Sequence, residues 1–407
     1  MSLTYFTILD ETELDEKIMS YGLRVYPKDS IPKYYSSVLY LWEITVSDTD
    51  PIEKSYGDSY YIKKIISAQR YSLLDPSTYD KFGFDICENK YLVNKACQIG
   101  DLNFLNWWKS SGLNLEYTCE SMDDASRNGH IDVLDWWLSS GFDKVYSHDA
   151  INGASAAGRT EVLDWWVKSG LPLKYSERAI DWASSNAHIN SLDWWLSWSK
   201  STGEKLKYTV EAMDSLYENN KIKVLNWWVL SGLELLYTYA CMDAASVHEQ
   251  IDVLNWWLKS GLEPKYSDYA MDKASKYGRL KSLDWWVSSG LEPKYTNYSI
   301  DWACLYSTFD TIKWWHNSSL NLKYSPDAVS YSCDEGKDEF LDYWIEHGTF
   351  FLQHVDSNLD TWQNEIGDTS DTFIEWWIKN LPKIIEFSMK RKLKNTLDKI
   401  PGVIIKK

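Results

Sequence analysis

The chain has little positive charge and no long apolar run. Its 42 lysines and arginines stand against 59 aspartates and glutamates, which gives a formal net charge of −17. This balance disfavours binding to nucleic acid or to an anionic membrane surface. The opening segment MSLTYFTILDETELDEK is mixed and acidic rather than a signal peptide, and no apolar stretch reaches the length of a membrane span. We therefore expect a soluble, cytoplasmic protein that binds neither nucleic acid nor membrane.

Cysteines are few and catalytic motifs are missing. The six cysteines form no CxxC pair, which is typical of small buried residues in a reducing compartment. The motifs GxGxxG, GxxxxGKS/T, HExxH and GxSxG do not occur, and the seven histidines lack the spacing of metal ligands. The sequence thus predicts no catalytic residue, no cofactor, no metal site and no enzyme.

What the chain does have is a tryptophan pair at a nearly fixed interval. The step between pairs is 29 residues, with two steps of 33. A fixed period of about 20–50 residues indicates a repeat array, in which each unit packs only on its neighbours. The pairs are Trp107-Trp108, Trp136-Trp137, Trp165-Trp166, Trp194-Trp195, Trp227-Trp228, Trp256-Trp257, Trp285-Trp286 and Trp314-Trp315, followed by Tyr343-Trp344 and Trp376-Trp377.

Each unit is predicted to be two short antiparallel helices, and residues 265–290 show the pattern clearly. Ser267 occupies an N-cap position, and Gly290 suits the left-handed end of the second helix. Four apolar residues share one face of the second helix and are expected in the core: Leu280, Leu283, Trp286 and Val287. The first tryptophan of each pair is offset from this face, so it should pack against the preceding helix or the next repeat.

Two further residue types recur with the tryptophans, each at the same position in successive repeats; such a set of equivalent positions is called a column. Tyrosines just before each N-cap should brace the start of the first helix. Aspartates within the first helix are expected to bond locally to a neighbouring turn, because stacked repeats would place them about 10 Å apart, too far for a shared metal. These aspartates are Asp123, Asp181, Asp214, Asp243, Asp272 and Asp301.

The unit in residues 272–291, DKASKYGRLKSLDWWVSSGL, resembles the ankyrin repeat HxAAxxGHxxxVxxLLxxGA. Gly278 matches the Gly of the Gly-His pair, and Trp286 with Val287 takes the place of the leucine pair. The resemblance implies a mostly α, ankyrin-like helical-repeat solenoid of about ten repeats. Each unit is about four residues shorter than the family repeat, so the projecting β-hairpins should be reduced or missing. Short WW-type repeats together with YFTILDE, VLYLWEITV and KKIISAQRYSLLDPSTYDKFGF look like the ankyrin-repeat families of amoeba-infecting giant viruses, the mimivirus group. That origin would place the protein in the host-cell cytoplasm.

The chain ends carry no regular repeat. Residues 1–88 are predicted to form a small α+β cap domain, with a strand over 38–46, a helix over 60–71 and an acidic helix face over 10–16. The array covers 89–381, with a degenerate last copy from about 353. Residues 382–407 read as a basic amphipathic helix that caps the array. A nuclear-import signal at 390–394, or an F-box-like opening at Leu381-Pro382, is the alternative for this tail.

In ankyrin arrays the exposed face of the first helix lines a groove, and here the matching column varies along the chain. It contains Asp124, Gly153, Trp182, Ser215, Ala244, Lys273, Trp302 and Tyr331, and Tyr277, Leu305 and Tyr306 extend it. Aromatic residues dominate binding hot spots, so Trp182, Lys273, Tyr277, Trp302, Leu305, Tyr306 and Tyr331 are the candidate partner-binding residues. Packing against the next repeat is the alternative for them, as it is for Trp198 in the longer copy.

The resulting functional prediction is a non-enzymatic scaffold that binds a protein partner in the groove. The alternative is a substrate adaptor of a ubiquitin ligase, in which the repeats choose the target and the tail or the N-terminal domain docks the ligase. The sequence predicts neither the partner's identity nor the oligomeric state.

Overall fold

The computed structural model describes residues 2–10, 22–325, 328 and 331. The chain divides into two compact units, Met1–Ala212 and Met213–Lys407. The first unit holds all the described strands and the first four helix pairs. The second unit holds the later helix pairs.

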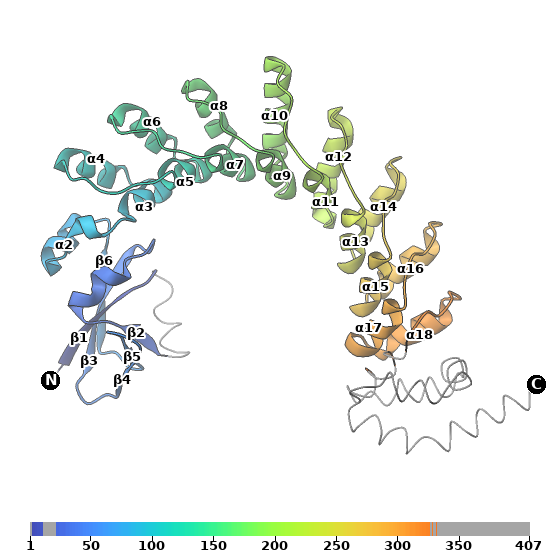
Figure 1. Cartoon of the computed structure of the whole chain (residues 1–407), viewed down its shortest axis with the longest axis horizontal. Coiled ribbons are helices and arrows are strands. Elements are labelled where there is room, and N and C mark those ends of the chain that lie inside the picture. Colours follow the sequence, from blue (N-terminus) through green and yellow to red (C-terminus); the bar gives the residue numbers. More distant parts are fainter. Residues whose placement is uncertain (1, 11–21, 326–327, 329–330, 332–407) are drawn as a thin grey trace, which may run out of the picture. The chain divides into compact units, whose positions relative to one another are not determined.

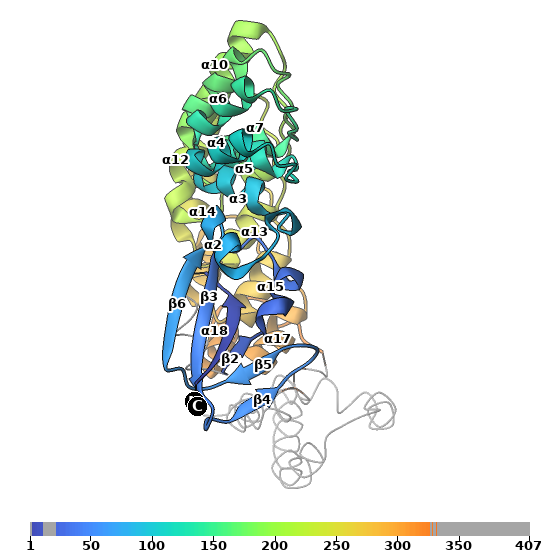
Figure 2. The same cartoon turned by 90° about the vertical axis from the view of Figure 1, so that its left-hand side faces the viewer.

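Two small antiparallel sheets build the N-terminal region (Figure 2). The first has the order β1-β3-β6, with bounds Ser2–Ile8, Tyr40–Ser47 and Ser67–Ser72. The second has the order β2-β5-β4, with bounds Leu23–Val25, Tyr60–Ile62 and Ile52–Lys54. Apolar side chains from both sheets form one buried cluster that includes Leu23, Val25, Ile44, Val46 and Ile62. The 3₁₀ helices Lys28–Tyr34 and Ile86–Glu88 and helix α2, Pro76–Phe82, complete the region.

The strand predicted over 38–46 is confirmed by β3, but the helix predicted over 60–71 is wrong. That segment forms β5 and β6, and Ile62 pairs with Leu23 of β2 while Ala68 pairs with Ile44 of β3. Its tyrosines and isoleucines favour strands, and a short apolar run does not by itself distinguish a helix from a strand. Backbone pairing with β2 and β3 therefore determined that this segment forms strands. The acidic run 10–16 lies outside the described residues except for Asp10.

In the first unit, helices alternate between two rows (Figure 1). Each repeat has a first and a second helix. The first helices α3, α5, α7 and α9 pack closely on one another, whereas the second helices α4, α6, α8 and α10 contact one another far less. The pairs are α3–α4 at Leu92–Ile99 and Leu102–Ser111, α5–α6 at Glu120–Asn128 and Ile131–Ser140, α7–α8 at Asp149–Ala156 and Thr160–Lys168, and α9–α10 at Arg178–Ser185 and Ile189–Thr202.

The second unit repeats this arrangement. First helices α13, α15 and α17 stack closely, and second helices α14 and α16 contact each other little. The helices are α12 at Ile222–Ser231, α13 at Ala240–Val247, α14 at Ile251–Lys259, α15 at Tyr269–Lys276, α16 at Leu280–Ser288, α17 at Tyr298–Tyr306 and α18 at Phe309–Asn317. The short α11, Glu211–Asp214, and a 3₁₀ turn at Asn219–Lys221 precede them. The linkers between described repeats contain no strand, in keeping with the shortened unit.

Local chemistry sets the helix boundaries. The hydroxyl of Ser267 accepts the backbone N–H of Tyr269 at 3.1 Å, as predicted for an N-cap column, and Thr238 caps α13 in the same way. Between α15 and α16 the chain turns at Gly278, where φ is +64° and a Cβ would lie 3.0 Å from the hydroxyl oxygen of Ser307. Glycine meets both constraints because it has no Cβ.

The core is a column of tryptophans. The second member of every described pair is buried almost completely: Trp108, Trp137, Trp166, Trp195, Trp228, Trp257, Trp286 and Trp315. The first members are buried or half-buried. The ring planes within a pair are nearly perpendicular, at 86° for Trp285 and Trp286. The pair therefore fills the core edge to face.

Val287 corrects one detail of the ankyrin match. The sequence placed it in the core, but its side chain is 44% exposed, whereas Trp285 is only 7% exposed. The large indole of Trp285 takes the inner position beside Trp286, and Val287, two residues after Trp285, turns toward solvent. The same column leaves Leu138, Val167, Val229 and Leu258 exposed.

The longer copy extends its second helix. The four extra residues make α10 a 14-residue helix that ends at Thr202 and is capped by Gly203. The half-buried Trp198 lies 5.5 Å from the ring of Trp195 and 5.9 Å from that of Tyr175. Of the two alternatives for Trp198, this structure shows packing.

Candidate protein-binding face

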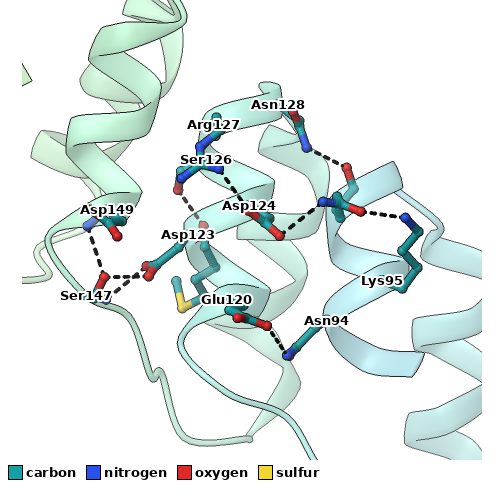
Figure 3. Close-up of polar contacts among 12 residues, drawn as sticks. Asn94, Lys95, Glu120, Asp123, Asp124, Ser126, Arg127, Asn128, Ser147 and Asp149 are labelled. Carbon is teal, nitrogen blue, oxygen red and sulfur yellow. Dashed lines mark hydrogen bonds and ion pairs between the residues drawn. The ribbon is translucent and has the colours of Figure 1, made fainter. Parts of the chain in front are cut away.

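The aspartate column fastens each repeat to the next. Asp123 of α5 accepts the backbone N–H of Ser147 at 2.9 Å and its hydroxyl at 2.6 Å (Figure 3). Asp272 accepts the amide and hydroxyl of Thr296 in the same way, at 2.9 and 2.5 Å. The predicted local bond to a neighbouring turn is confirmed, and these carboxylates serve packing rather than ligand binding.

Burial changes the ionisation of this column. Desolvation raises the pKa of Asp123, Asp181, Asp243 and Asp272 above the ordinary aspartate value, while the hydrogen bonds from the following serine or threonine oppose the rise. Two repeats use asparagine instead: Asn152 accepts the backbone N–H of Ser176 at 3.1 Å and donates to its hydroxyl at 2.9 Å. A neutral side chain therefore satisfies the same two groups.

The tryptophans also bond across repeats. The first member donates its indole N–H to a residue of the preceding second helix, as from Trp285 to Asn255 at 2.9 Å. The second member donates its indole N–H to the first helix of the preceding repeat, as from Trp286 to the hydroxyl of Ser246 at 2.9 Å. The sequence predicted that the first tryptophan packs against the preceding helix or the next repeat, whereas its bond reaches the second helix of the preceding repeat.

Tyrosines and lysines hold the linkers together. The ring of Tyr266 lies 4.6 Å from that of Trp286, and its hydroxyl donates to the carbonyl of Glu292 at 3.0 Å. The ammonium of Lys294 lies 4.4 Å from the Tyr266 ring centroid. A lysine ammonium lies over the ring in the same way at Tyr146, Tyr175, Tyr237 and Tyr295. These regular columns are occupied by contacts between repeats. The irregular first-helix column is partly accessible, since Trp182 is exposed and Lys273 and Trp302 are half-buried.

In the first unit this column is mixed. Asp124 lies 3.6 Å from Arg127 in an ion pair and accepts a bond from Gln98 (Figure 3). Gly153 is buried, and a Cβ there would lie 3.0 Å from the Arg127 guanidinium nitrogen. Trp182 is 38% exposed, with the guanidinium of Arg178 5.3 Å from its ring centroid. Trp182 is thus an accessible aromatic residue among polar neighbours.

In the second unit the column forms an aromatic and cationic cluster. Trp302 of α17 is half-buried and stacks on Tyr298, with 4.6 Å between ring centroids and a 15° angle between planes. The Lys273 ammonium lies 4.5 Å from the Trp302 centroid, so the structure brings these two predicted residues together. Tyr277 and Tyr306 are 48% and 57% exposed.

Three members of this cluster were missed by the sequence prediction. Lys276 of α15 lies 4.0 Å from the Tyr306 ring centroid and 5.3 Å from that of Trp302. Tyr269 and Tyr298 begin the two helices and are each 50% exposed. The prediction followed one column, whereas a helix face also includes residues three and four positions away. That spacing in YAMDKASKY and YSIDWACLY was the available signal.

The remaining predicted residues, Leu305 and Tyr331, are half-buried, and both take part in interactions with other residues. The last copies and the tail 382–407, including 390–394 and Leu381, lie outside the described residues. The predictions for them remain open.

The described residues include a shallow crevice in the N-terminal region. It is lined by Leu39, Leu74, Tyr91 and Lys95 among others, and it is too small to hold a water molecule. No group of three potential metal ligands occurs in the described ranges. Among these residues no helix is both long and apolar enough to cross a bilayer.

Paired antiparallel helices, closely stacked first helices and linkers without strands define an ankyrin-like helical-repeat solenoid with a small N-terminal strand region. An uncharacterised protein of Acanthamoeba polyphaga mimivirus is 41% identical over 117 residues, which are 28% of this chain and 36% of that protein. The match thus spans little more than a third of that relative. The ankyrin repeat domain of human ASB11 aligns with 50% of this chain and 86% of that domain, at 14% identity and a TM-score of 0.25. No protein-family model matches the chain.

Proposed function

We propose that this protein is a non-enzymatic scaffold that binds a protein partner through the exposed face of its first helices. The observation that supports this proposal most directly is that the columns differ in burial and in how much they vary between repeats. The regular columns are buried or bonded between repeats, whereas one partly accessible column changes from repeat to repeat and includes aromatic residues. Stacked repeats create extended surfaces of this kind, and exposed aromatic clusters mark interaction sites on soluble proteins.

The two units contribute separately to this proposal. Trp182 is the accessible aromatic residue of α9 in the first unit. The cluster around Trp302 is the larger candidate, because four exposed tyrosines contact either Trp302 or one of the two lysines beside it: Tyr269, Tyr277, Tyr298 and Tyr306. The alternative of a ubiquitin-ligase adaptor needs either the N-terminal domain or the tail, which lies outside the described residues, to dock the ligase. No described contact favours it. Given the mimivirus relative, we place this binding activity in the cytoplasm of an infected host cell.

Affinity purification with mass spectrometry tests the proposal. Wild type is compared with the single variants Trp182→Ala and Trp302→Ala, each shown by circular dichroism to stay folded. Val167→Ala and Leu230→Ala serve as matched controls, because they remove exposed apolar side chains from second helices. A protein partner lost in a tryptophan variant but retained by the controls is the expected result. Identical partner lists in all five proteins would contradict the assignment.

A further inference from the structure

Among the described surfaces, the first-helix face of α15 and α17 has an unusual charge. Each helix contains one acidic residue, Asp272 and Asp301. Both are buried, and both accept bonds from the next repeat, from Thr296 and Ser325 respectively. The charges left on the accessible face of these helices are those of Lys273 and Lys276, in a chain whose net charge is −17.

Aromatic rings hold both ammonium groups at this face. Lys273 lies over Tyr269 and Trp302, at 4.9 and 4.5 Å from the ring centroids. Lys276 lies over Trp302 and Tyr306, at 5.3 and 4.0 Å. Among the described residues neither ammonium has a carboxylate partner in an ion pair. Cation–π contacts orient a charge without neutralising it, so both lysines remain able to pair with an anion.

We propose that this surface binds an acidic peptide segment of a partner protein, with at least two carboxylates beside an apolar or aromatic side chain. This inference rests on the proposed scaffold function and specifies the partner's chemistry. The carboxylates pair with Lys273 and Lys276, and the apolar side chain lies against Tyr277 and Tyr306. We propose an acidic peptide because of charge complementarity: a positive patch on an acidic protein favours a locally negative partner.

Nucleic acid fits the same surface less well. It would also offer anions and stacking bases, but an extended polyanion feels the charge of the whole chain. With a net charge of −17 that field is repulsive. A short acidic segment needs only the two local lysines. It is screened from the remaining charge over about one Debye length, roughly 8–10 Å at ordinary salt.

Fluorescence anisotropy with the full-length protein tests the inference. The probes are three labelled peptide pools with the same aromatic and aliphatic content, in which the remaining positions are Asp/Glu, Asn/Gln or Lys/Arg, together with an oligothymidylate. The acidic pool should bind at least about tenfold more tightly than the neutral pool, and added salt should weaken that binding. Tighter binding of the neutral pool, the basic pool or the oligonucleotide, or no binding of any pool, would overturn the inference.

Variants then locate the binding. Lys273→Gln/Lys276→Gln should abolish the preference for the acidic pool, whereas Lys273→Arg/Lys276→Arg should keep it. Lys168→Gln/Lys259→Gln is the matched control, because it removes two exposed charges from second helices. Equal weakening in this control would contradict the assignment to α15 and α17. A protein partner that depends on Trp302 but binds the glutamine variant normally would retain the scaffold function and reject the acidic partner.

Discussion

The indole N–H of Trp286 donates to the hydroxyl of Ser246, forty residues earlier, at 2.9 Å. The bond joins the second helix of one repeat to the first helix of the preceding one. The same relationship recurs from Trp166 to Ser126 and from Trp195 to Ser155, at 3.1 and 2.8 Å. In these three repeats, the polar partner of the buried ring is supplied by the preceding repeat.

Ser246→Ala should destabilise the array. It leaves the buried Trp286 N–H without an acceptor, which costs about 1–3 kcal/mol. Ser246→Cys should cost less, because Trp137 already donates to the sulfur of Cys97 at 3.4 Å. Chemical denaturation monitored by far-UV circular dichroism measures both, and equal losses for the two variants would contradict the role of the bond.

The two members of a tryptophan pair should differ in their contribution. Trp257 is 1% exposed, so Trp257→Ala should lower the free energy of unfolding by about 3–5 kcal/mol. Trp256 is half-buried and bonded to Asn226 at 2.7 Å, so Trp256→Ala should cost less. The same denaturation experiment compares them. A larger loss for Trp256→Ala would show that the core is misassigned.

The aspartate column should tolerate asparagine but not alanine. Asp272→Asn keeps an acceptor for the Thr296 amide and a partner for its hydroxyl, as Asn152 does for Ser176. Asp272→Ala removes this acceptor from the part-buried amide and hydroxyl of Thr296 and should cost about 1–3 kcal/mol in all. If thermal unfolding shows equal melting temperatures for the two variants, the bonds do not stabilise the interface between repeats.

The pH dependence of stability should reflect the raised pKa values of the buried aspartates in this column. Their folded pKa lies above the unfolded value, so the folded state binds more protons between the two values. Their contribution to stability is therefore present below the unfolded pKa and is lost as pH rises through the folded pKa. Asp272→Asn should flatten this slope relative to wild type in melting curves taken from about pH 4 to about pH 7. An unchanged slope would mean that Asp272 titrates alike in both states.

The buried thiols should be unreactive in the folded protein. Burial raises the pKa of Cys97 and of Cys241 to about 12, so little thiolate exists at neutral pH. Of the cysteines within the described part of the chain, Cys87 is exposed and should be the first that iodoacetamide alkylates. Peptide mass mapping after a short exposure measures the order, and denatured protein is the control. Early modification of Cys97 would indicate that the first repeat opens readily.

The proposed binding surface was only partly visible in the sequence. The varying column identified Trp182, Lys273 and Trp302, because residues free of packing change from repeat to repeat. It did not reveal that Lys276 lies over Tyr306 or that Tyr298 stacks on Trp302. Those contacts join side chains of adjacent helices, and their positions follow from how α15 and α17 pack.

The sequence by itself determined the repeat. Its period, its capping hydroxyls and its buried indoles are local features, and each unit contacts mainly its neighbours. Tertiary structure decided the rest. Residues 60–71 became strands because β2, β3 and β4 supplied backbone partners, and Val287 turned outward because Trp285 filled the inner position. In both cases local propensity left more than one conformation open, and the choice followed from hydrogen bonds and volume provided by residues distant in the chain.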